Sequence, residues 1–305
     1  MSAPVVFNST TITSGLISDI TSNQNAMSAL EQQIATGNAI QQPSDNPAGA
    51  AQILQLQAVV KRNEQYSANI SDGMSLSATA DGTLNQVLSI LQSVQSTVES
   101  VTASRMQGPS TMSAMADQVQ SSLTDLQNLA NASYNGVPLF SGTGTAAFDA
   151  SGTYVGAGSA PTRTVAPGVQ IPVSITGNQV FGAGATGLLS TVPGNLGVLA
   201  QTVSDLQTNT TASVNHIINV DIPNLKAAIA TVESAAATIG SNQQALQNYK
   251  TQTQNTQTSV LGELSGVQQV NMAQAITQLQ ANQTSYQEAL YAASQLNADS
   301  LVKYL

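Results

Sequence analysis

Hydrophobic residues near the start of the chain recur at intervals that alternate between four and three residues. Five apolar residues and one asparagine make up this series: Leu16, Ile20, Asn23, Met27, Leu30 and Ile34. This is the heptad spacing of a coiled-coil stripe. The pattern predicts a helix that ends at Gly37 and needs a partner helix along its apolar side.

The segment "QQPSDNPAGA" (41–50) interrupts this helical pattern. Pro43 and the helix-capping residues Ser44, Asp45 and Asn46 favour a turn, and Pro47 stands at what would be the first position of a new helix. The sequence therefore predicts a turn that leads into a second helix.

The second helix is predicted to be long. A further apolar series with four-three spacing runs toward its end: Leu84, Val87, Leu91, Val94, Val98 and Val101. The helix is expected to reach about Ser104, where "RMQGPS" (105–110) breaks it. A third helix follows and ends near "ASYNG" (132–136).

Between Val137 and about Leu196 the helical period is lost, and Gly, Thr, Pro and Val dominate. Short β-like pieces are separated by glycine turns: "GTYVG" (152–156), "TRTVAPGVQIPVSI" (162–175) and "NQVFG" (178–182). This composition and these short segments predict a small β-rich inserted domain.

Helical periodicity then resumes and continues to the end of the chain. The last stretch carries apolar residues at helical spacing: Ile276, Leu279, Tyr286, Leu290 and Ala293. The chain ends on the apolar residues Leu301, Tyr304 and Leu305, although chain ends are usually polar and frayed. Because neither terminal stripe has another partner, the simplest arrangement pairs the two ends of the chain, parallel or antiparallel.

The predicted fold is therefore mainly α, an elongated rod of long helices with coiled-coil-like paired termini and a small β-rich inserted domain. Segments 1–42 and 266–305 are expected to form an axial core domain. Segments 43–136 and 196–265 form the helical rod domain, and 137–195 forms the β-rich outer domain.

Composition limits the classes of function. Only 8% of the 305 residues are charged, so long uncharged helix faces could pack against identical neighbours; the alternative is a compositional bias of solvated faces. The net charge of -9 and seven scattered basic residues argue against a nucleic-acid partner. No apolar run is long enough to span a membrane, and the first residues lack the pattern of a cleaved signal peptide.

Catalytic and metal-binding chemistry is poorly supported. The sequence has no Cys and a single histidine, His216, near Ser213 and Asp221. No nucleophile-elbow motif accompanies this histidine, and α-helical spacing places His216 and Asp221 on different faces. The carboxylates are otherwise isolated, without the spacing of a calcium loop. We therefore expect no enzyme activity, no cofactor and no metal site.

Several segments carry a family resemblance. "QQIATGNAI" (32–40) and "PSDNPAGAAQI" (43–53) resemble the N-terminal signature of the flagellin superfamily, and the two prolines are similar to its hook-associated protein 3 family. "NEQYSANISDG" (63–73), "YNGVPLFSGT" (134–143) and the segment 272–305, with its Ser-Leu-x-x-Tyr-Leu ending, resemble the same family. The β-rich middle is not covered by the resemblance.

The resemblance implies an axial structural subunit of the bacterial flagellum, at the junction between hook and filament. It implies export through the flagellar type III channel without cleavage, and four kinds of partner: identical subunits in a ring, a neighbouring hook-associated protein, flagellin, and an export chaperone that binds the C-terminal region. Two alternatives stay open, a divergent flagellin and a secreted adhesin whose β-rich middle binds a ligand.

The resemblance and the two terminal stripes together predict an assembly interface. Its expected residues are Leu16, Ile20, Met27, Leu30, Ile34, Ile276, Leu279, Tyr286, Leu290, Leu301, Tyr304 and Leu305. The turn at Pro43, Ser44, Asp45 and Pro47 is the expected family signature.

Overall fold

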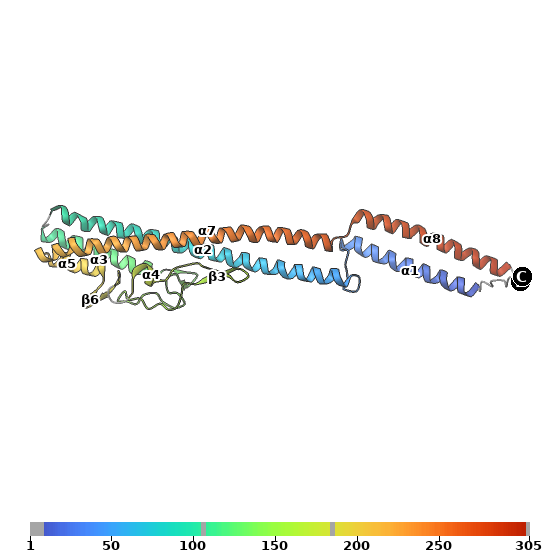
Figure 1. Ribbon diagram of the computed structural model, residues 1–305, viewed down its shortest axis with the longest axis horizontal. Helices are drawn as coiled ribbons and strands as arrows, with labels where there is room; N and C mark the ends of the chain where they lie inside the picture. Colours follow the sequence, from blue (N-terminus) through green and yellow to red (C-terminus); the bar gives the residue numbers. More distant parts are fainter. Residues whose placement is uncertain (1–8, 105–107, 184–186, 303–305) are drawn as a thin grey trace. The chain divides into compact units, whose positions relative to one another are not determined.

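The structure is a computed structural model that describes residues 9–104, 108–183 and 187–302 (Figure 1). The chain divides into two compact units. We call residues 1–62 and 256–305 the terminal unit, and residues 63–255 the central unit. Long helices with a few short strand pairs make up the described residues, which confirms the mainly α fold class.

In the terminal unit, α1 (Ser9–Thr36) packs side by side with α8 (Met272–Val302), as Figure 1 shows. Asn38 forms an isolated antiparallel β-bridge with Gln269. Farther along the pair, the side-chain amide of Gln24 donates a hydrogen bond to the hydroxyl of Tyr286. Residue numbers therefore decrease along α1 in the direction in which they increase along α8, so the two helices are antiparallel. The predicted pairing of the two terminal helices is confirmed.

Backbone hydrogen bonds tie the ends of this pair together. Gly37 ends α1 with a positive φ of 73°, a conformation that glycine adopts without strain. The amide of Ala39 then donates to the carbonyl of Gln268 (2.7 Å), and the amide of Val270 donates to the carbonyl of Gly37 (3.0 Å). The two connections are thus held against each other where α1 ends and α8 begins.

The signature turn folds as its residue types suggest. One carboxylate oxygen of Asp45 accepts hydrogen bonds from the amides of Gln41 and Gln42 (3.0 and 2.8 Å). The side chain of Asn46 accepts from the amide of Gly49 (2.9 Å), which satisfies a donor in the first turn of the next helix. That helix, α2, begins at Pro47 and ends at Ser104 (Pro47–Ser104), as predicted.

The central unit has one hydrophobic core. It is formed by α2, by α3 (Pro109–Ala130), by α5 (Val198–Thr208) and by α7 (Ile222–Gln268), together with the strand region. The apolar series of α2 that the sequence predicted lies wholly inside this core: Leu84, Val87, Leu91, Val94, Val98 and Val101. An ion pair between Lys226 and Glu99 (3.0 Å) also links α7 to α2.

The described residues between α3 and α5 form three antiparallel strand pairs. They are β1 (Ser133–Tyr134) with β2 (Val137–Pro138), β3 (Thr162–Ala166) with β4 (Val169–Pro172), and β5 (Thr191–Val192) with β6 (Asn195–Leu196). The β3–β4 pair docks on α2, where Arg163 pairs with Asp72 (2.6 Å) and the hydroxyl of Ser77 donates to the carbonyl of Val173 (2.7 Å).

Two of the predicted strands are wrong. The segment "GTYVG" (152–156) contains only an isolated bridge, between Tyr154 and Phe148. The segment "NQVFG" lies largely in the short helix α4 (Gly177–Phe181). A capping box between Thr176 and Gln179 starts a helical turn there, and this local hydrogen bonding outweighs the β propensity of Val180 and Phe181. The pair Phe140 and Phe181, with rings edge to face at 5.9 Å, then packs α4 into the core.

Two short elements join α5 to α7. They are α6 (Thr211–His216) and the π-helix η2 (Ile217–Asp221). Thr210 caps α6, accepting a hydrogen bond from the amide of Ser213 (3.2 Å). Within the described residues, no helix is both long enough and apolar enough to cross a bilayer.

Candidate functional site

The α1 side of the terminal helix pair follows the predicted heptads closely. All six predicted positions are half-buried, namely Leu16, Ile20, Asn23, Met27, Leu30 and Ile34. The positions between them are exposed, with the exception of Gln33. The stripe therefore faces α8, but none of its side chains is fully covered by that helix.

The α8 side of the pair has a different composition. The less exposed positions again alternate by four and three residues: Ala275, Leu279, Asn282, Tyr286, Ala289 and Ala293. We call the two facing stripes the α1–α8 seam. Leu279 and Tyr286 belong to it, whereas Ile276 and Leu290 do not, being 46% and 44% exposed. Small alanines occupy the seam, so α1 can approach α8 closely.

The larger apolar side chains of α8 form a second face beside the seam. Residues of an α-helix are about 100° apart, so Met272, Ile276 and Leu290 fall within about 40° of one another. Each of the three is between 43% and 46% exposed, and the neighbouring Tyr291 is 67% exposed. We call these four residues the open apolar face.

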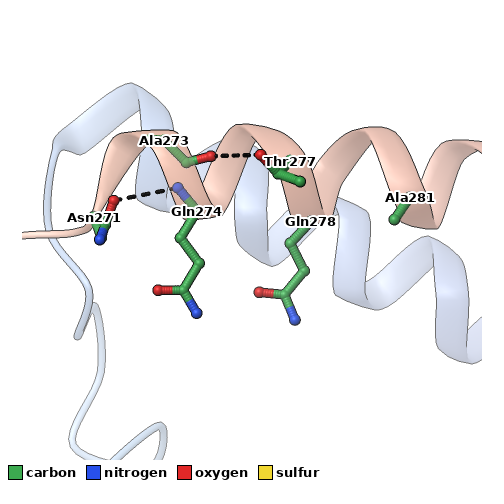
Figure 2. Close-up of a pocket in the computed structure, with 6 residues that line it drawn as sticks. All are labelled: Asn271, Ala273, Gln274, Thr277, Gln278 and Ala281. Atoms are coloured by element: carbon green, nitrogen blue, oxygen red, sulfur yellow. Dashed lines mark hydrogen bonds between the residues drawn. The ribbon is translucent and has the colours of Figure 1, made fainter.

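On another side of α8 lies a shallow depression (Figure 2), lined by Asn271, Ala273, Gln274, Thr277, Gln278 and Ala281. Figure 2 shows the side chains of Gln274 and Gln278 extending from the same side of the helix, one turn apart. The side chain of Asn271 accepts from the amide of Gln274 (3.2 Å) at the start of the helix. This side of α8 offers amide groups and small side chains but no charge.

The remaining predicted interface residues lie at the chain end. Leu301 falls within α8, and Tyr304 and Leu305 lie outside the described residues. The sequence of α1 and α8 contains four acidic residues and no basic one: Asp19, Glu31, Glu288 and Asp299. The surface of the helix pair is therefore almost uncharged, which permits close lateral packing of helices without strong repulsion.

A separate cluster of polar residues lies in the central unit, where α5, α6 and η2 meet. The Nδ1 atom of His216 lies 2.8 Å from Oδ2 of Asp205 and 3.3 Å from Oδ1 of Asp221. The side-chain amide of Gln201 donates a second hydrogen bond to Oδ2 of Asp205 (3.0 Å). We call Asp205, His216 and Asp221 the histidine cluster.

This cluster corrects two expectations from the sequence. His216 and Asp221 do share a face, because η2 is a π-helix, whose wider turn brings residues five positions apart to the same side. The carboxylates of Asp205 and Asp221 are also not isolated, since both contact His216. Nothing in the residue pattern indicates the π turn, and α-helical spacing therefore places His216 and Asp221 on different faces.

Burial shapes the electrostatics of the cluster. The side chain of Asp221 is only 3% exposed, whereas that of His216 is 41% exposed. Burial, together with the negative charge of Asp205, raises the pKa of Asp221 to about 7, against the opposing effect of His216. The Oδ2 atom of Asp221 has no hydrogen-bond partner among the described residues.

Two family models match the chain. The model of the bacterial flagellin N-terminal helical region matches residues 7–145, and the model of the bacterial flagellin C-terminal helical region matches residues 222–305. The chain belongs to the flagellin superfamily. The segment between the two flagellin matches contains β3 to β6, the part that the sequence resemblance also left uncovered.

Curated relatives include two kinds of flagellar protein. The chain is 29% identical over 169 residues to flagellar hook-associated protein 3 of Salmonella typhimurium, a match of 54% of this chain and 53% of that protein. It is 27% identical over 129 residues to the flagellin of Escherichia coli, 42% of this chain and 26% of that protein. The chain thus spans about half the length or less of these relatives.

The fold is also similar to solved structures. The crystal structure of flagellar hook associated protein-3 from Legionella pneumophila has a TM-score of 0.60 with 13% identity, over 70% of this chain and 98% of that one. At this level of identity the likeness establishes a shared fold. It agrees with the helical architecture described above.

Proposed function

We propose that this chain is a structural subunit of the bacterial flagellum and forms the junction between hook and filament. The observation that carries the proposal is the open apolar face of a terminal helix in a chain of the flagellin superfamily. Apolar side chains that a folded unit leaves in water mark a surface that a partner covers.

The predicted interface residues divide into two roles in this proposal. Those of the seam, such as Leu30, Leu279 and Tyr286, hold α1 and α8 together. Ile276 and Leu290 contact neighbouring subunits, because the seam does not cover them. Burying a side chain of this size contributes about 1.5–3 kcal/mol, and a ring or filament repeats the contact at every subunit.

The junction is favoured over a bulk filament subunit by the relatives. The match extends over 53% of hook-associated protein 3 but over 26% of the flagellin, and the similar solved structure is also a hook associated protein-3. A divergent flagellin is the second candidate, because flagellin matches the same terminal helices. Neither candidate requires catalysis, and we propose that the protein is not an enzyme.

The proposal also covers the binding partners of the protein and its route of export. Identical subunits, another hook-associated protein and flagellin are the proposed neighbours, and an export chaperone binds the C-terminal region before assembly. The protein is secreted by the flagellar type III system without a cleaved signal peptide and resides outside the cell. The nearly uncharged surfaces of α1 and α8 suit such lateral packing.

Localisation tests the proposal. An epitope inserted at the exposed turn of Gly168, between β3 and β4, leaves both terminal helices unchanged. Immunogold labelling of intact flagella should then place the label in one band between hook and filament. Label along the whole filament would instead establish the flagellin alternative. Label absent from flagella would reject both.

A further inference from the structure

The histidine cluster brings together three side chains that the flagellar role leaves unexplained. Asp205 comes from α5, His216 ends α6, and Asp221 ends η2. One potential ligand atom from each residue lies within 4.8 Å of the other two. All three residues belong to the central unit, and none of them is part of α1 or α8.

The buried carboxylate of Asp221 is the unusual member. It is almost completely enclosed, yet its Oδ2 atom has no hydrogen-bond partner among the described residues. Buried polar atoms without a partner are rare in folded proteins, because losing water without compensation costs free energy. A cation beside His216 that contacts both carboxylate oxygens of Asp221 would supply the missing partner.

The backbone beside the cluster contains a π turn, the element η2. A π turn is uncommon in helices and occurs often at functional sites. Here its effect is to place Asp221 beside His216, which an α-helical turn would separate. The irregularity therefore has one visible consequence, the convergence of the two side chains.

The separations suit a small cation. Zinc lies about 2.0–2.2 Å from nitrogen and carboxylate ligands, so adjacent ligand atoms at tetrahedral to right angles are about 3.0–3.4 Å apart. The observed separations from Nδ1 of His216 are 2.8 Å to Asp205 and 3.3 Å to Asp221. A bound ion would therefore require Nδ1 of His216 and Oδ2 of Asp205 to move slightly apart.

The donor set indicates which cations fit. One imidazole nitrogen with two carboxylates suits divalent transition metals, whereas Mg²⁺ and Ca²⁺ prefer oxygen ligands alone. Asp205 and Asp221 would balance the charge of a divalent ion, and Gln201 already orients Oδ2 of Asp205. His216 is 41% exposed on its side chain, which leaves an approach from solvent.

We propose that Asp205, His216 and Asp221 form a binding site for a divalent transition-metal ion of the Zn²⁺ type. The ion would join α5 to the segment that leads into α7 and so fix one end of the helical core. The competing explanation is a metal-free ion triad, in which the ring nitrogen of His216 contacts both carboxylates directly. The two differ in whether the protein takes up a metal.

The sequence makes a metal-binding test easy to interpret. His216 is the only histidine, and the chain has no cysteine. The full-length protein, freed of metal with a chelator, is titrated with Co²⁺ and followed by visible absorption and by the NMR signals of the single imidazole. We expect one equivalent to bind and the imidazole signals to shift, with Zn²⁺ displacing Co²⁺ and raising the melting temperature.

Substitutions assign the ligands. We expect His216→Gln and Asp221→Asn each to weaken Co²⁺ binding by at least about 100-fold, since loss of a supporting residue alone costs 10–100-fold. Asp117→Asn, at an exposed position of α3, is the matched control and should bind as the unchanged protein does. If Asp221→Asn fails to fold by circular dichroism, His216→Gln carries the assignment.

Two results would overturn the proposal. One is the absence of stoichiometric Co²⁺ and Zn²⁺ binding at micromolar protein, which would leave the ion triad as the explanation. The other is binding that persists unchanged in His216→Gln, which would place the metal elsewhere. Neither result bears on the flagellar role, because the test involves only the central unit.

Discussion

The terminal unit and the central unit bury their hydrophobic residues very differently. Among the described residues, the central unit encloses a continuous core that includes Leu84 and Leu91. In the part of the terminal unit that the structure describes, only Val260 and Ala275 are buried hydrophobic residues. Several large apolar side chains in the same described part are exposed: Ile17, Leu54, Leu261, Met272, Ile276, Leu290 and Tyr291.

This difference shows two uses of the same kind of helix. Long helices with heptad stripes occur in both units, but in the central unit several helices and the strand region surround each stripe. In the terminal unit α1 and α8 cover only one side of each other. Because most helical stability comes from covering the apolar face, α1 and α8 gain less of it from each other than the helices of the central unit gain from their core. Under the proposed function, neighbouring subunits supply the rest of that cover.

The largest predicted effect is a difference in the free energy of unfolding between two leucine-to-alanine variants, one in each unit. Leu84→Ala removes a fully buried side chain and should lower the free energy of unfolding by about 2–5 kcal/mol. Leu290→Ala removes a 44% exposed side chain and should change it by less than about 0.5 kcal/mol, while weakening assembly. Urea unfolding of both variants measures the difference, and equal losses would contradict the comparison.

A smaller effect is expected at the start of α2. Asn46→Ala removes the side-chain acceptor for the amide of Gly49 and should destabilise the first turn of the helix by about 1 kcal/mol. Faster amide hydrogen exchange over residues 47–52 is the expected result, and Ser44→Ala serves as the neighbouring control. Unchanged exchange in Asn46→Ala would mean that the turn does not depend on this cap.

The smallest effect concerns a loop of the central unit. Asp149 accepts hydrogen bonds from the hydroxyl of Ser151 (2.6 Å) and from the amide of Thr153 (2.9 Å), and these bonds lower its pKa. Their stabilisation is therefore present above the ordinary pKa of 3.8 and is lost as the pH falls through the lowered value.

An NMR titration of the Asp149 carboxyl group checks this sign. The midpoint should lie below 3.8, and it should move toward that value in the Ser151→Ala variant. Because Asp149 is exposed, solvent screens the interaction and the effect on stability should be slight. A midpoint above 3.8 would show that the loop does not hold this geometry in solution.

The sequence predicted the helices well because their signals are local. The heptads of α1, the cap and proline at the start of α2, and the buried series of α2 all follow from residue type and spacing. In α8 the same method selected Ile276 and Leu290 by their size, although Ala275 and Ala289 occupy the seam. Hydrophobicity alone does not distinguish a side chain that packs within its own chain from one that its own chain leaves exposed.

The histidine cluster was beyond sequence patterns for another reason. The contact between His216 and Asp221 depends on a π turn, and Asp205 reaches them only through the connection between α5 and α6. Spacing rules assume α-helical geometry, so they separate residues that the actual backbone brings together. A tertiary contact of this kind requires the structure.

Amide hydrogen exchange of α8 in the free chain and in assembled flagella tests the central claim most directly. In the free chain, peptides from residues 272–295 should exchange much faster than the core of α2, because the open apolar face lacks its cover. In assembled flagella their exchange should slow strongly, while that of the central unit changes little. Slow exchange of α8 already in a verified monomer, or no slowing on assembly, would contradict the account.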